Sequence, residues 1–162
     1  MVGSDWSPFR LSDDLNAGPG LSGMGFVAFT SGMVAGRLAG DWASAKLGQE
    51  RLLKYAVFVA VTGFGIACLI DHAALVFIGL GLAALGISVL FPALYHAAAQ
   101  APGRPGATLG AMTAGSRSAM LVAPLMIGVL ADSGVFSVGM AMAVVALPCL
   151  LVIALFSGRV FR

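Results

Sequence analysis

Arg117 and the hydroxyl residues near it are the polar groups that stand out in an apolar part of the sequence. The run Gly110-Ala-Met-Thr-Ala-Gly-Ser-Arg-Ser-Ala-Met-Leu-Val-Ala-Pro124 holds one charged side chain, in a stretch that is otherwise uncharged from Pro105 to Ala131. Hydroxyl groups at Thr113, Ser116 and Ser118 make its turn polar. Serine hydrolysis would need a histidine in reach and an oxyanion site, which this pattern does not offer. The set therefore favours binding of an anionic group, and we expect no catalytic residues and no enzymatic activity.

The solvent around these residues follows from composition. The chain of 162 residues is 59% hydrophobic and 10% charged, with a mean hydropathy of +0.98, whereas soluble domains carry about 25% charged residues. Long uncharged runs recur at 15–36, 55–70, 72–103 and 133–158. A bilayer core needs about 20 helical residues to cross it. The sequence thus predicts an all-α, multi-pass membrane protein embedded in the lipid bilayer.

The runs divide into five predicted transmembrane helices within a membrane domain over 20–158. An N-terminal segment, 1–19, and a short tail, 159–162, flank this domain. The predicted spans are 20–40, 53–70, 73–99, 108–131 and 136–157. Helix is expected because backbone exposed to lipid must satisfy its own hydrogen bonds.

Basic residues fall on alternate sides of these spans. One side carries Lys46, Arg51, Lys54, Arg104, Arg159 and Arg162, and the other carries Arg10. The positive-inside rule places the richer side in the cytoplasm. We therefore expect the cytoplasmic membrane as the location, with the N-terminus outside and the C-terminus in the cytoplasm.

Glycines and prolines indicate how the helices pack. Gly32, Gly36 and Gly40 recur every four residues and would let another helix approach closely. Pro92 interrupts the third predicted span and frees the carbonyl of Ser88, so we expect curvature there. Cys68 and Cys149 both fall in apolar runs and are expected to be small buried residues, without a metal site.

Arg117 lies nine residues beyond Thr108, roughly 13 Å into the membrane at 1.5 Å per residue. Arginine at that depth costs about 2.5–3.5 kcal/mol on insertion scales. One interpretation is that Arg117, with Ser116 and Thr113, faces a central cavity and pairs with an anionic substrate group or a gating carboxylate. The other is that it snorkels or bonds backbone carbonyls inside the bundle.

The stretch GRLAGDWASAKLGQERLLK, Gly36 to Lys54, resembles the short cytoplasmic loop motif of the major facilitator superfamily. The stretches DWSPFRLSDDL, GLGLAALGISVLFPALYHAAAQAPG and APLMIGVLAD also resemble C-terminal halves of prokaryotic members. The resemblance implies that the five spans correspond to helices eight to twelve. It also implies a cytoplasmic gating loop that contains Gly36, Arg37, Gly40, Asp41, Lys46, Gly48 and Arg51. Ala45 stands where the family often has an acid, so the usual charge relay is either absent or moved to Asp41. The loop is then either a latch that closes the cytoplasmic side of the bundle in one state or an ordinary basic cytoplasmic loop.

The resemblance implies a function in secondary active transport of a small solute by alternating access. That family binds substrate between two six-helix halves near the midplane. Five spans form only part of one six-helix bundle, so the missing N-terminal half or another chain is an expected partner. The alternative is a truncated product that does not transport, or a membrane scaffold subunit. No cofactor is expected, and the net charge of +2 does not suggest nucleic acid.

Overall fold

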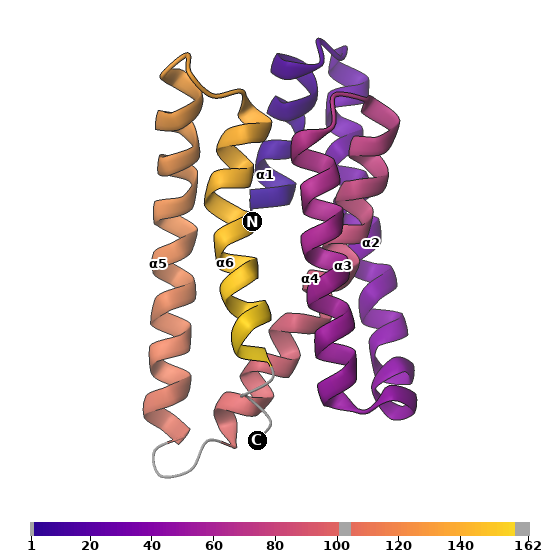
Figure 1. The fold of residues 1–162 in the computed structure, drawn as a ribbon, viewed down its shortest axis with the longest axis vertical. Coiled ribbons are helices and arrows are strands. Elements are labelled where there is room, and N and C mark those ends of the chain that lie inside the picture. The colour runs from indigo at the N-terminus through magenta and orange to yellow at the C-terminus, as the bar shows by residue number, and fades with distance from the viewer. Residues whose placement is uncertain (1, 101–104, 158–162) are drawn as a thin grey trace.

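The computed structural model describes residues 2–100 and 105–157, which form helices joined by short connections (Figure 1). No strand occurs in these ranges. A short helix and a π-helical turn precede five long helices. The elements are α1 (Val2–Phe9), η1 (Arg10–Asp14), α2 (Pro19–Leu47), α3 (Gln49–Leu69), α4 (Ala73–Ala99), α5 (Pro105–Asp132) and α6 (Val138–Ser157). The prediction of an all-α membrane protein is confirmed.

Four described helices are long and apolar enough to cross a membrane. They are α3, α4, Gly106–Asp132 of α5 and Val138–Leu155 of α6. The longest helix, α2, is not among them, because repeated glycine, serine and threonine residues lower its hydropathy. Figure 1 shows α2 running beside α4 along the bundle. That α2 is the fifth span stays a prediction.

The predicted loop between the first two spans, residues 41–52, is wrong. Helix α2 continues to Leu47, α3 begins at Gln49, and only Gly48 joins them. Gly48 has φ +74° and ψ 155°, a conformation open essentially to glycine alone. The basic residues assigned to this loop therefore lie on helix ends. The predicted tail, 159–162, and Arg104 lie outside the described residues.

The N-terminal segment was expected to lie outside the membrane domain, but its first helix lies inside the bundle. Figure 1 shows α1 beside α6 and level with the long helices. Gly3 faces the ring of Phe29 on α2. Val2 and Trp6 pack against the core cluster that contains Ile127 and Val138. Eight residues are too short to be recognised as a span, yet they bury one face against neighbouring helices. That the segment lies outside the membrane stays a prediction.

The core forms where α4 lies between α3 and α2. A Cβ atom on Gly79 would lie 2.7 Å from the backbone nitrogen of Ala67, and one on Gly86 would lie 2.7 Å from that of Ala60. From the other side, a Cβ atom on Gly32 would meet the backbone of Gly81. These backbones touch without side chains between them, which is how helices associate in lipid.

Helix α4 bends in its second half. Pro92 lies inside the helix, and the last turns swing away from α3 towards α5 in Figure 1. The Ser88 hydroxyl donates a hydrogen bond of 2.7 Å to the carbonyl of Leu85 just before this point. The expected curvature is present. Helix α5 stands at the edge of the bundle. Of its most apolar stretch, 6% is buried, compared with 44% for α4.

The glycine contacts give a paired prediction on α3. We expect Gly63→Ala to destabilise the fold by about 1–3 kcal/mol, because the added methyl group would press on the backbone of Ala83 and, at 2.8 Å, on the carbonyl of Gly79. Gly65 has nothing within 4 Å of its Cβ position. Gly65→Ala should therefore be neutral, or stabilising by about 0.5–1 kcal/mol. Thermal unfolding in detergent measures both, and equal melting temperatures would contradict the packing argument.

Candidate functional site

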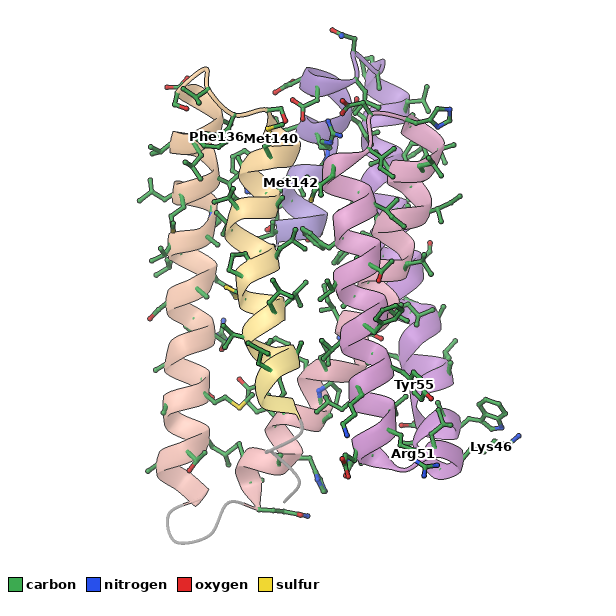
Figure 2. The ribbon with its side chains drawn as sticks, viewed as in Figure 1. Lys46, Arg51, Tyr55, Phe136, Met140 and Met142 are labelled. Atoms are coloured by element: carbon green, nitrogen blue, oxygen red, sulfur yellow. The ribbon has the colours of Figure 1, made fainter. Side chains whose placement is uncertain are left out.

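The two ends of the bundle differ in charge. Basic residues outnumber acidic ones near the α2–α3 turn, where Arg37, Lys46, Arg51 and Lys54 accompany Asp41 and Glu50. Acidic residues outnumber basic ones at the other end, where Asp13, Asp14, Asp71 and Asp132 accompany Arg10. Figure 2 shows Lys46 and Arg51 at the lower, basic end, with Phe136 at the opposite end. Polar clusters occur at both ends and near the middle of α5.

A groove of about 780 Å³ opens at the basic end between α2, the first turn of α3 and the bent end of α4. Four of the predicted gating residues line it, namely Gly36, Arg37, Gly40 and Asp41. Tyr95 and His96 of α4 line the facing side. The structure thus brings part of the predicted gating set together with two α4 residues that the motif did not include.

Gly36 and Gly40 shape this groove in different ways. A Cβ atom on Gly36 would lie 2.6 Å from the carbonyl of Leu85 and would also meet the Ser88 hydroxyl. On Gly40 it would meet only a methyl group of Val89, at 3.4 Å. Helix α2 therefore touches α4 at Gly36 and separates from it one turn later, where the groove begins.

The other predicted gating residues lie outside the groove. Gly48 forms the α2–α3 turn. The Lys46 ammonium lies 4.3 Å from the ring centroid of Trp42, a cation–π geometry. Arg51 is exposed beside the turn. Within the described residues, Asp41 forms no ion pair with Arg37, Lys46 or Arg51 in this conformation.

Arg117 lies near the centre of α5, and its side chain is exposed. The Ser116 hydroxyl donates a hydrogen bond of 2.9 Å to the carbonyl of Thr113. The phenol of Tyr95 lies near Ser116 and Thr113, and near enough to Arg117 for that charge to act on it. Because Tyr95 also lines the groove, it links the groove to the Arg117 turn.

Sequence reasoning missed a third cluster, at the acidic end. The Arg10 side chain is 2% exposed and forms ion pairs with Asp14, at 2.8 Å, and Asp71, at 2.7 Å. Its guanidinium also donates to the carbonyls of Ala67, at 3.4 Å, and Ile70, at 3.2 Å. The i, i+4 spacing of Arg10 and Asp14 was the available signal, but their segment appeared to be a solvated terminus.

This cluster caps two helices at once. Arg10 binds carbonyls at the C-terminal end of α3, where the last turn lacks partners. Asp14 accepts hydrogen bonds from the backbone nitrogens of Val138, at 3.0 Å, and Gly139, at 2.8 Å, which begin α6. Each charge has the sign that the helix dipole favours. One ion pair therefore joins the end of α3 to the start of α6.

Ser137 completes the start of α6. Its hydroxyl accepts from the nitrogen of Met140 at 3.2 Å, and its carbonyl accepts from that of Ala141 at 2.9 Å. The open backbone N–H groups of Val138, Gly139 and Met140 are thereby all paired. Removing one partner from a buried ion pair costs about 3–5 kcal/mol, so this cluster is a strong constraint on how η1, α3 and α6 meet.

Comparison with known proteins gives one informative match. The chain is 31% identical over 135 residues, or 83% of its length, to an uncharacterised MFS-type transporter of Yersinia pestis. The matched region is 35% of that transporter, so the chain spans about a third of the relative's length. No family model matches the chain, and no solved structure matches it. Taken with the all-helical membrane fold, this similarity supports the predicted resemblance to the major facilitator superfamily.

Proposed function

We propose that this chain is part of a secondary active transporter that moves a small solute across the cytoplasmic membrane by alternating access. The similarity to a transporter supports the general class. The observation that carries the proposal further is the exposed Arg117 near the centre of α5, beside the hydroxyls of Thr113, Ser116 and Tyr95. An arginine inside a membrane usually faces an aqueous cavity or a polar partner.

In this proposal Arg117 attracts an anionic group of the solute, or a carboxylate from the remainder of the transporter. The hydroxyls of Thr113 and Ser116 orient that group. Because α5 is almost unburied in this chain, the facing wall of the path comes from the other half or from another chain. The alternative, a membrane scaffold without transport, gives no reason for water to reach this turn.

The groove at the basic end is proposed to open and close as the bundle rocks. Asp41, which forms no ion pair with any described residue in this conformation, would pair with a neighbouring basic side chain when the groove closes. The close contact at Gly36 would serve as the fulcrum, since α2 and α4 already touch there. The proposed orientation places this basic end in the cytoplasm, with the acidic end outside.

Cysteine labelling tests the solute path. In a protein lacking Cys68 and Cys149, the Ser116→Cys variant should react with an anionic methanethiosulfonate at least about tenfold faster than Leu121→Cys, because a thiol in lipid does not ionise. Leu121 is 78% exposed on the same helix. Adding Arg117→Gln should remove a roughly tenfold preference for the anionic over a cationic reagent at position 116. Equal rates at positions 116 and 121 would favour the scaffold.

Asp41→Asn tests the gate. A single cysteine at Ser44, which lines the groove, should react about fivefold faster in the Asp41→Asn variant, since the closed state loses an ion pair. Asp132→Asn changes an exposed carboxyl group at the other end and is the matched control. An unchanged rate with Asp41→Asn would remove Asp41 from the gate.

Orientation is tested in intact cells with a membrane-impermeant maleimide. Ser133→Cys, in the α5–α6 connection, should be labelled from outside. Gln49→Cys, at the start of α3, should be labelled only after the cells are permeabilised. Both residues are exposed, so accessibility to solvent does not separate them. The reverse pattern would invert the proposed orientation.

A further inference from the structure

The ion-pair cluster around Arg10 has no part in the proposed solute path. It lies at the acidic end, whereas the groove lies at the basic end. Arg10 nevertheless holds three segments together, because its partners come from η1, from the end of α3 and from the α3–α4 connection. Through Asp14 it also reaches α6.

The two carboxylates that bind Arg10 differ in their surroundings. The Asp14 side chain is 11% exposed and is held by two backbone nitrogens of α6. The Asp71 side chain is 81% exposed and binds the other terminal nitrogen of the guanidinium. An ion pair open to water contributes little and is weakened by salt. The ion pair between Asp71 and Arg10 can therefore break while the ion pair between Asp14 and Arg10 stays formed.

The Arg10 guanidinium fits against α6 only because residue 139 is a glycine. A Cβ atom at this position would lie 2.6 Å from Nε and 2.9 Å from Cζ of Arg10, and would also meet the carbonyl of Cys68. Arg10 thus sits wedged between the end of α3 and the first turn of α6. A methyl group here would displace the arginine without changing any charge.

We propose that Arg10 is the pivot of a conformational clamp at the acidic end, with Asp14 as its fixed arm and Asp71 as its releasable arm. Release of Asp71 lets the α3–α4 connection move away from α6 while the N-terminal segment stays bound to α6. Cys68 reports this movement, because it is 2% exposed in the same core cluster as Val138 and Met142 of α6. The clamp is independent of the transport proposal.

The test measures the rate at which a maleimide reacts with Cys68 in the native protein in lipid nanodiscs, in a Cys149→Ser background because Cys149 is exposed. We expect slow reaction with the clamp intact. Asp71→Asn should accelerate it about threefold, since it removes an exposed partner. Asp14→Asn and Gly139→Ala should each accelerate it at least about tenfold, since they disrupt the buried part of the cluster. Raising the salt concentration should accelerate the parent protein but not Asp71→Asn.

A charge exchange separates this clamp from an ordinary ion pair. Arg10→Asp combined with Asp14→Arg keeps the ion pair but places the wrong charge at both helix ends. The maleimide should therefore react with Cys68 faster than in the parent protein. The matched control exchanges Glu50 and Lys54, an exposed i, i+4 pair at 2.7 Å on α3, by Glu50→Lys with Lys54→Glu. In that control, the maleimide should react with Cys68 as slowly as in the parent protein.

Two results would overturn the proposal. One is that the Arg10–Asp14 exchange variant is labelled at Cys68 as slowly as the parent protein. The other is an unchanged rate in both Asp71→Asn and Gly139→Ala. These two variants keep the test decisive if Asp14→Asn does not fold.

Discussion

Backbone contact between helices at glycine is the constraint on which the rest of this structure depends. In lipid, apolar side chains gain nothing by leaving the solvent, so helices associate through close packing and polar contacts. Gly63, Gly79 and Gly86 remove the side chains that would hold α3 and α4 apart. Gly32 and Gly36 do the same for α2 on the other side of α4. The position of α4 between two partners follows from these five residues.

Because α4 bends, it contacts different helices before and after Pro92. Before Pro92 the helix is held between α2 and α3, and after it the last turns leave α3 and reach towards α5 (Figure 1). Tyr95 is thereby carried to the hydroxyls of Thr113 and Ser116 while it still lines the groove beside α2. A helix bent near one proline thus links the packed centre of the bundle to its exposed edge.

The two ends of the bundle are built differently. At the acidic end, a nearly inaccessible arginine and a mostly buried aspartate satisfy backbone groups of α3 and α6, which ties these helices together. At the basic end, α2 and α4 separate below Gly36 and leave a groove whose charged residues form no ion pair with one another. The acidic end is thus held by buried charge, whereas the basic end is held mainly by helix packing at Gly36.

The sequence by itself determined the helical membrane fold, because a chain this apolar can satisfy its backbone in lipid only within helices. It also placed Arg117 near the middle of a span and located Gly32 and Gly36 among the packing glycines, since both depend on spacing along one helix. Only the tertiary structure decided that Asp14 binds nitrogens of α6 and that Tyr95 lies beside Thr113. These partners lie far apart in the chain, so the packing and bending of whole helices bring them together. The extension of α2 through Asp41 to Leu47 was missed for a local reason, because charged residues near a membrane surface fit a helix end as well as a loop.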